Sequence, residues 1–105
     1  MPLFGKNKID AVVVGVRYQN DGRIDWVRAY ERRGPTWSDW KLFKRQDLFT
    51  RLQAGEKWVA GERLQFQGGT FETGEPLRVV RAGGSDVVVV GPDRDRDELA
   101  GVPQV

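Results

Sequence analysis

Two stretches near the start of the chain have the pattern of paired β-strands. Residues 9–18 (IDAVVVGVRY) are rich in β-branched side chains. In residues 24–33 (IDWVRAYERR), aromatic or basic side chains alternate with the small apolar Val27 and Ala29. Residues 19–23 (QNDGR) separate the two stretches with an Asn-Asp-Gly turn signal, in which the glycine can take a positive φ. The pattern therefore predicts a β-hairpin over residues 9–33.

The segment after the hairpin predicts a third strand. A Gly-Pro pair at 34–35 interrupts the chain, and residues 37–45 (WSDWKLFKR) follow it. The alternative is a helix that begins with a cap at Thr36 or Ser38 and continues to residue 54. We favour the strand because the large apolar side chains of this segment fit a single helical stripe poorly.

Residues 47–55 (DLFTRLQAG) have the pattern of a short helix. Asp47 can cap the first turn, Leu48 and Leu52 lie one turn apart, and Gly55 stands where a helix usually ends. A helix of about two turns is too short to be stable by propensity alone. We therefore expect packing against the strands to stabilise it.

Short β segments separated by glycines fill the second half of the chain. We expect strands at residues 57–60, 63–67, 70–73, 77–82 and 87–90, with turns or bulges at Gly61, Gly68-Gly69, Gly74 and Gly83-Gly84. The Gly83-Gly84-Ser85 sequence is typical of a hairpin tip. Residues 87–90 are four valines without polar alternation, which predicts a strand buried on both faces or shielded at an edge.

These elements predict a mainly β fold, either a small twisted sheet or a partly closed barrel, with one short helix after the third strand. OB-like barrels also place a helix between their third and fourth strands, and SH3-like barrels fit nearly as well. Both likenesses are analogies of element order and carry no function. We expect a flexible leader at residues 1–8, a single β-rich domain at 9–91, and a flexible acidic tail at 92–105, where charged residues dominate.

The composition argues against several activities. The 105 residues include no cysteine and no histidine, which removes disulfides, thiolate catalysis, the commonest general base and the commonest transition-metal ligand. Residues 93–98 (DRDRDE) resemble the start of an EF-hand loop, but Glu98 and Gln104 stand where glycine and glutamate are needed. We therefore expect no enzymatic activity, no cofactor and no metal ion.

Charge and apolar runs give an expectation about location and partners. The longest apolar runs, such as residues 11–16, are far too short to cross a bilayer, and no secretory signal is visible. We expect a soluble, cytoplasmic protein with no membrane contact. Residues 1–91 carry 15 basic and 11 acidic side chains, whereas residues 92–105 carry 2 and 4. The positive excess of the main domain is weakly compatible with a polyanionic partner.

The aromatic and basic residues are concentrated in residues 26–45, which contain three of the four tryptophans and six basic side chains against two acidic ones. Because alternate residues of a strand share a face, one face is expected to carry aromatic and guanidinium groups in turn: Trp26, Arg28, Tyr30 and Arg32. Bases stack on aromatic rings and arginine binds phosphates, so this face suits single-stranded nucleic acid. The structural alternative is that the aromatic rings pack under a loop while the arginines extend to water.

The next predicted strand would add a second row to this surface. Trp37, Lys41 and Arg45 would share one face there, although simple cross-strand aromatic packing is an alternative explanation. We predict a non-catalytic binding module that holds single-stranded nucleic acid through these two rows. The alternative function is a protein–protein interaction or assembly domain that uses the same patch or an exposed strand edge. We also expect the acidic tail to fold over this surface and compete with phosphate.

Overall fold

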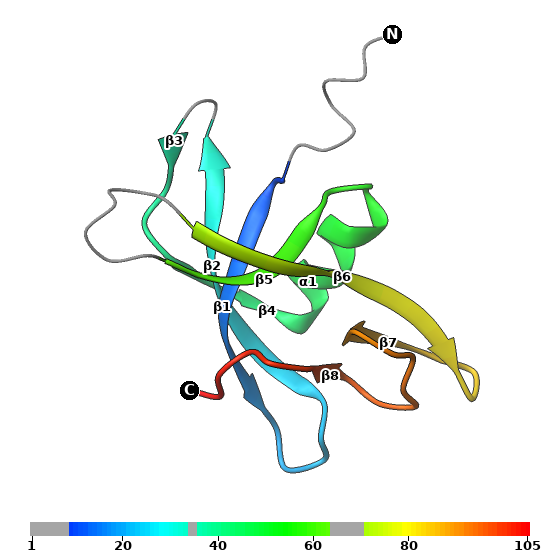
Figure 1. The fold of residues 1–105 in the computed structure, drawn as a ribbon. Helices are drawn as coiled ribbons and strands as arrows, with labels where there is room; N and C mark the ends of the chain where they lie inside the picture. The colour runs from blue at the N-terminus through cyan, green and yellow to red at the C-terminus, as the bar shows by residue number, and fades with distance from the viewer. Residues whose placement is uncertain (1–8, 34–35, 64–70) are drawn as a thin grey trace, which may run out of the picture.

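The computed structural model describes residues 9–33, 36–63 and 71–105. The predicted leader at 1–8, the Gly68-Gly69 turn and most of the predicted strand at 63–67 lie outside these residues. Within the described ranges the chain forms eight strands and one helix (Figure 1). In chain order they are β1 (Ala11–Tyr18), β2 (Ile24–Arg33), β3 (Thr36–Trp37), β4 (Lys41–Lys44), α1 (Arg45–Gln53), β5 (Trp58–Arg63), β6 (Phe71–Ala82), β7 (Ser85–Val90) and β8 (Glu98–Leu99).

The predicted hairpin of β1 and β2 is confirmed. The two strands are antiparallel, with Val13 opposite Ala29 and Val16 opposite Val27. All four of these side chains are fully buried, so this side of the hairpin faces the core. Gly22 has a φ of 89° in the connecting turn, a left-handed conformation that glycine adopts without steric strain.

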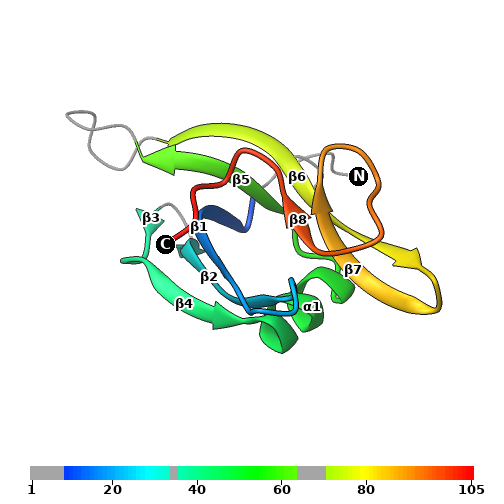
Figure 2. The same ribbon diagram turned by 90° about the horizontal axis from the view of Figure 1, so that it is seen from below.

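The strands form one twisted sheet in the order β3-β2-β1-β5-β6-β7-β8, and β4 pairs with β2 as well. The long strand β6 serves two partners, because its first half pairs with β5 and its second half pairs with β7. This shared strand curves over one side of the molecule (Figure 2). The path of strands ends at β3 and β8 and does not close, so the fold is a small twisted sheet. The likeness to OB or SH3 barrels remains a prediction.

The strand predicted for residues 37–45 is wrong in its middle and at its end. The chain leaves the sheet at Ser38, whose hydroxyl accepts a hydrogen bond from the Glu31 amide at 3.1 Å. The Ser38 amide donates to the Glu31 carbonyl at 2.8 Å. Hydroxyls that bond to backbone in this way compete with a regular ladder. Pairing with β2 resumes only over Lys41–Lys44, and Arg45 already belongs to the helix.

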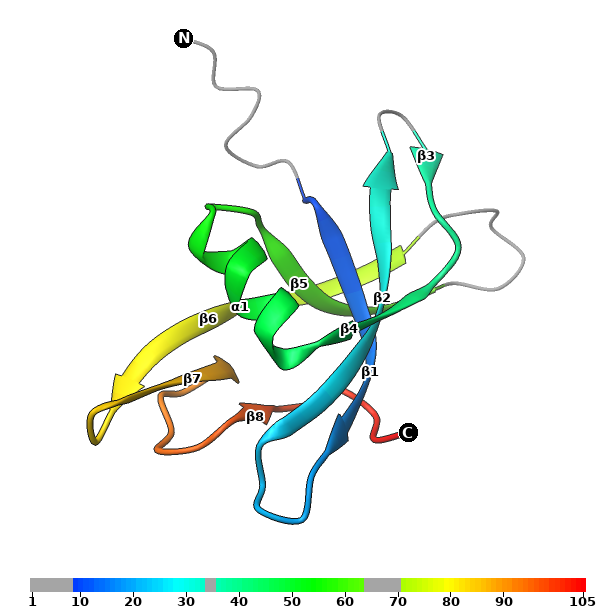
Figure 3. The same ribbon diagram turned by 180° about the vertical axis from the view of Figure 1, so that it is seen from behind.

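Helix α1 begins two residues earlier than predicted. Its N-cap is Lys44, which makes no side-chain capping hydrogen bond, and the predicted cap Asp47 lies inside the first turn. The predicted end is confirmed: Gly55 has a φ of 93°, and its amide donates to the Leu52 carbonyl at 3.1 Å. The helix contacts β2, β4 and β6 (Figure 3), and these contacts supply the packing that so short a helix requires.

The glycines of the second half differ in their roles. Gly74 lies within β6, so the strands predicted at 70–73 and 77–82 are one continuous strand. Gly61 lies within β5, beside a register shift in the pairing of β5 with β6. The predicted hairpin tip is confirmed, since Gly83 and Gly84 have φ values of 58° and 86° between the ends of β6 and β7.

The core lies between the sheet and α1. Trp58 is fully buried and meets Phe43 edge-on, with ring centroids 5.0 Å apart, and α1 contributes the fully buried Leu48. The valines at 87–90 are each at most 7 % exposed, which confirms the predicted burial on both faces. In the part of the chain that the structure describes, no helix has the length and apolar character needed to cross a membrane.

Residues 92–105 are not a flexible tail. Leu99 and Val102 are 2 % and 8 % exposed, and both belong to the hydrophobic core. Strand β8 pairs with β7 in parallel, and the side chain of Asp97 is fully buried. A few buried positions thus outweigh the charged composition that predicted disorder.

Candidate functional site

One side of β2 carries the predicted alternation of aromatic and basic residues. Val27 and Ala29 point into the core, so alternate residues point to the opposite side. That side carries Trp26, Arg28, Tyr30 and Arg32, of which Arg32 is exposed and the other three are half-buried. We call this side of β1, β2 and β4 the outer face.

The register of the strands places further residues on the outer face. Trp26 lies between Arg17 of β1 and Lys44 of β4. Arg28 lies in the same way between Gly15 of β1 and Leu42 of β4. Paired residues of neighbouring strands point to the same side of a sheet. The outer face therefore combines an indole ring flanked by two cations with an arginine flanked by a glycine and a leucine.

Two tryptophans hold arginines of β2 by cation–π contacts. The guanidinium of Arg28 lies 4.6 Å from the ring centroid of Trp40, and that of Arg32 lies 5.5 Å from the ring centroid of Trp37. Such contacts restrict where the guanidinium can point. Trp40 is 49 % exposed, so much of this indole remains accessible to a partner.

The predicted second row is not assembled. Trp37 lies beside Arg32 on the outer face. Lys41 is paired with Ala29, so it points to the other side, where its ammonium lies 3.5 Å from a Glu31 carboxylate oxygen. Arg45 is the first residue of α1 and makes an ion pair on another part of the molecule. The break at Ser38 changes the alternation, and the helix begins before Arg45 can share a strand face with the other two residues.

Sequence reasoning missed four members of the outer face: Arg17, Trp40, Leu42 and Lys44. The signal for two of them was present in the alternation of KLFK (41–44). Phe43 is buried, so Leu42 and Lys44 must point outward. Nothing in the sequence marks the contact of Trp40 with Arg28, because Trp40 belongs to the irregular segment between β3 and β4.

Three cations of the outer face lack a carboxylate partner among the described residues. Elsewhere in the described ranges most basic side chains are paired with carboxylates, for example Arg51 with Glu31 at 2.7 Å and Arg78 with Asp93 at 2.8 Å, and Lys57 is an exception. Among the described residues, Arg17, Arg28 and Lys44 form no ion pair with a carboxylate. Their positive charge is therefore not neutralised within this part of the fold.

The environment of Arg28 combines exposed apolar groups with a buried polar atom. Trp40 and Leu42 are 49 % and 51 % exposed, and Val105 is 41 % exposed. The ring of Trp40 contacts the Arg28 guanidinium, and Leu42 lies opposite Arg28 in β4. Val105 contacts Gly15, which lies opposite Arg28 in β1. The Nε of Arg28 is buried and has no hydrogen-bond acceptor within the described ranges. An unsatisfied donor of this kind destabilises the state in which it is buried.

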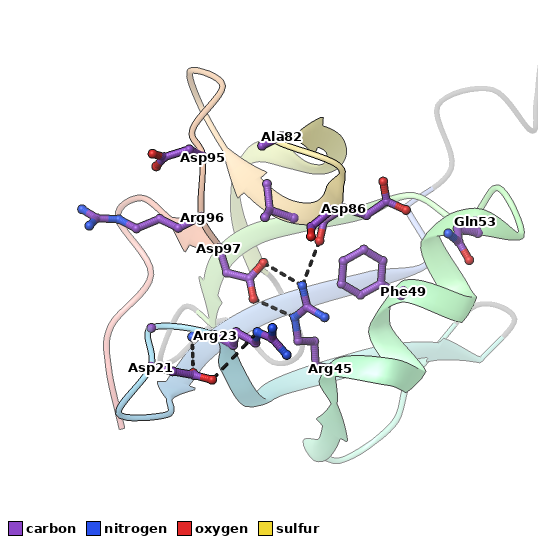
Figure 4. Close-up of a pocket in the computed structure, with 13 residues that line it drawn as sticks. Asp21, Arg23, Arg45, Phe49, Gln53, Ala82, Asp86, Asp95, Arg96 and Asp97 are labelled. Carbon is purple, nitrogen blue, oxygen red and sulfur yellow. Dashed lines mark hydrogen bonds and ion pairs between the residues drawn. The ribbon is translucent and has the colours of Figure 1, made fainter.

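A second group of charged residues lines a pocket of about 610 Å3 between the β1–β2 turn, α1 and the loop before β8 (Figure 4). At its centre, Asp97 accepts hydrogen bonds from the Arg45 guanidinium at 2.7 and 3.3 Å. The amides of Ile24 and Val88 donate to the same carboxylate at 2.9 and 3.0 Å. The Arg45 guanidinium also lies 4.5 Å from the Phe49 ring centroid. These contacts engage both charged groups within the fold.

The pKa of Asp97 reflects this network. Burial of the carboxylate raises its pKa, but the hydrogen bonds from Arg45, Ile24 and Val88 outweigh burial and hold the pKa below its ordinary value. Asp97 is therefore an ionised group that stabilises the fold. Its engagement with four donors leaves it poorly suited to act as an acid or a base.

Neither metal chemistry nor a known relative directs attention to another site. The described residues contain no group of three or more acidic side chains that could hold a metal ion. Comparison with models of protein families, with curated protein sequences and with solved structures found no match to this chain. The residues of the outer face are therefore the main guide to function.

Proposed function

We propose that this protein is a non-catalytic module that binds single-stranded nucleic acid on its outer face. The observation that carries the proposal is that Arg17, Arg28 and Lys44 lack carboxylate partners among the described residues, beside the accessible indole of Trp40. A polyanion would supply the missing negative charge, and unpaired bases would supply rings to stack on the indole. No step of this function requires a reaction or a cofactor.

The arrangement of the outer face suggests how the ligand would lie. The ring of Trp40 would stack on a base, while the Arg28 guanidinium that it contacts would bind an adjacent phosphate or base edge. Arg17 and Lys44, on either side of Trp26, would bind phosphates of the same strand. The Arg32–Trp37 pair would extend the track in the direction of β3.

The position of Lys44 gives independent support to a role in binding anions. Lys44 is the N-cap of α1 and makes no side-chain capping hydrogen bond. Serine, threonine, aspartate or asparagine would stabilise that position, and a positive charge there opposes the helix dipole. Lys44 thus destabilises the start of the helix both as a poor cap and as a misplaced charge. Residues that cost stability in this way are typical of functional surfaces.

The proposal is tested by titrating the protein with a mixed-sequence single-stranded oligonucleotide and following tryptophan fluorescence. We expect saturable quenching at low salt, because bases stack on Trp40. Binding should weaken steeply as salt is raised, since phosphate contacts release counterions. The absence of saturable quenching at low salt would overturn the proposal.

Matched variants assign the binding to the outer face. Replacement of Arg17 by alanine should weaken binding and lower the slope of log K against log salt by about 0.7 for each phosphate that the variant no longer binds. Arg81, on the β6–β7 hairpin, is the charge-matched control, because its side chain is 73 % exposed and lies at 3.9 Å from Asp86. Equal effects of Arg17→Ala and Arg81→Ala would mean that binding depends on net charge and not on this face.

A specific observation favours a second candidate, a protein-binding surface. Leu42 and Val105 are exposed beside Trp40, and nucleic acid makes little use of aliphatic side chains. Exposed apolar groups that lie together on a surface are typical of protein contacts. Leu42→Ser separates the two candidates: it should weaken a protein contact strongly and leave oligonucleotide binding within about twofold. A protein contact should also survive salt that abolishes oligonucleotide binding.

A further inference from the structure

The segment after Val102 runs along the open edge of β1. The Val16 amide donates to the Pro103 carbonyl at 2.9 Å, and the Val105 amide donates to the Val16 carbonyl at 2.9 Å. Gln104 is thereby bridged to Val16 in parallel orientation. Both Figure 1 and Figure 2 show the C-terminus beside β1. Residues 103–105 therefore add a short strand-like segment next to the outer face.

The side chain of Val105 is seated on the outer face by Gly15. A Cβ at Gly15 would lie 3.2 and 3.3 Å from the two methyl carbons of Val105, closer than most real Cβ contacts. The same Cβ would lie 3.5 Å from the Cβ of Arg28, the residue opposite Gly15 in β2. The absence of a side chain at Gly15 thus makes room for Val105 beside the base of Arg28.

Gly15 of β1, on which Val105 is seated, lies opposite Arg28, the residue that the proposed ligand would need most. The guanidinium of Arg28 contacts the ring of Trp40. The Nε of Arg28 is buried with no acceptor in the described part of the chain. A ligand oxygen that reached this donor would supply the acceptor that it lacks. A ligand that takes the space of Val105 beside Gly15 would therefore approach an arginine with an unsatisfied donor.

The attachment of this segment is strong at one end and weak at the other. Leu99 and Val102 are buried in the core, whereas Val105 is 41 % exposed and is held by one backbone hydrogen bond and its contact with Gly15. Of the carboxylates expected to compete with phosphate, Asp93 is paired with Arg78 and Asp97 with Arg45. Residues 103–105 would compete for the outer face through the space that they occupy.

We propose that residues 103–105 are an autoinhibitory strap, which covers the outer face at Arg28 and is displaced when single-stranded nucleic acid binds. The inference rests on the proposed function, because it names the regulation of that same face. The apparent affinity then equals the affinity of the open form reduced by the fraction of molecules in which the strap is open. Any change that holds the strap closed should weaken binding, and any change that loosens it should strengthen binding.

The decisive experiment locks the strap with an engineered disulfide. The natural chain contains no cysteine, so the double variant Gly15→Cys, Val105→Cys has a single possible pair. The proximity of a Gly15 Cβ to the Val105 methyl groups suits the geometry of a disulfide. After oxidation with glutathione disulfide, a free-thiol assay establishes that the bond has formed, and far-UV circular dichroism establishes that the sheet is retained. The titration with the oligonucleotide is then made before and after reduction.

We expect the oxidised double variant to bind at least about tenfold more weakly than the reduced form, because the open fraction falls. Reduction of the unsubstituted protein should change nothing, since it has no thiol. Equal affinity of the oxidised and reduced forms, with normal binding by the unsubstituted protein, would overturn the strap and leave the proposed function intact. No binding by any form, including the unsubstituted protein, would overturn both proposals.

A second variant tests the strap without a disulfide. Val105→Gly removes the methyl groups that sit on Gly15 but leaves the charges and rings of the outer face in place. We expect this variant to bind the oligonucleotide roughly threefold more tightly, because the closed state is weakened. Unchanged or weaker binding would show that Val105 does not restrict access to Arg28 and would overturn the strap.

Discussion

Loss of the Asp97 carboxylate would leave two backbone amides without their acceptor and the Arg45 guanidinium without its counter-ion, since Arg45 would keep only the Asp86 carbonyl as an acceptor. The Arg45 guanidinium and the amides of Ile24 and Val88 all donate to the Asp97 carboxylate. We expect Asp97→Ala to lower the free energy of unfolding by about 3 kcal/mol, because buried donors lose their partner. Urea denaturation measures the change.

The control for this prediction is an acidic residue of the same segment with an exposed ion pair. Asp93 is 72 % exposed and lies 2.8 Å from Arg78. Asp93→Ala should therefore change the free energy of unfolding by less than about 1 kcal/mol. Similar losses for the two variants would contradict a structural role for the buried pair of Asp97.

The pH dependence of stability follows from two carboxylates with lowered pKa values. Hydrogen bonds outweigh burial and lower the pKa of Asp97, and the hydrogen bond from Arg51 is the main cause that lowers the pKa of Glu31. A group whose pKa is lower in the folded chain stabilises the fold while it is ionised. That contribution is present above the pKa of the unfolded chain and is lost as pH falls through the folded pKa.

We therefore expect the free energy of unfolding to be nearly constant from about pH 6 to 8 and to fall below about pH 4. The chain contains no histidine that could titrate between these ranges. Urea denaturation at a series of pH values measures the profile. The acid decline should be shallower in Asp97→Ala than in the unsubstituted protein. A decline that already begins near pH 6 would disprove this account.

At the scale of elements, the start of α1 joins stability to binding. Lys44→Ser supplies a capping hydroxyl and removes a charge that opposes the helix dipole, so it should raise the free energy of unfolding by about 1 kcal/mol. The same change removes a proposed phosphate ligand and should weaken oligonucleotide binding. Thermal denaturation and the fluorescence titration measure the two effects.

Lys44→Ala separates the cap from the charge. It removes the ammonium without adding a capping oxygen, so it should weaken binding as much as Lys44→Ser does while giving less of the gain in stability. If both variants bind as tightly as the unsubstituted protein, Lys44 has no part in the binding site. The unfavourable cap would then need another explanation.

The elements that sequence patterns predicted correctly are those determined by neighbours in the chain. The β1–β2 hairpin follows from alternation and a glycine turn, and the end of α1 follows from Gly55. The break between β3 and β4 was not predictable, because it depends on hydrogen bonds between Ser38 and Glu31 across the sheet. That break decides which side chains join the outer face, so the first row of the candidate site was predicted and the second row was not.

At the scale of the whole molecule, the C-terminal segment shows the limit of composition as a guide. Residues 92–105 are charged enough to predict disorder, yet Asp97 finds its cation at Arg45, 52 residues earlier in the chain. Leu99 and Val102 enter a core made by strands from the first half. Contacts over such separations leave no periodic signal in the local sequence. The same segment also brings residues 103–105 to the outer face.

The integration of this segment into the core predicts a large effect of a single truncation. Leu99 is 2 % exposed, and its amide donates to the Tyr18 hydroxyl at 2.9 Å. Leu99→Ala should lower the free energy of unfolding by about 3 kcal/mol, because it leaves a cavity in the core. Val105→Ala, at a 41 % exposed position of the same segment, should lower it by less than about 1 kcal/mol. Urea denaturation of the two variants distinguishes a segment that is packed into the core at Leu99 and weakly held at Val105 from a segment that contributes nothing to stability. In the second case both substitutions would be neutral, and the strap would have no fixed point from which to cover Arg28.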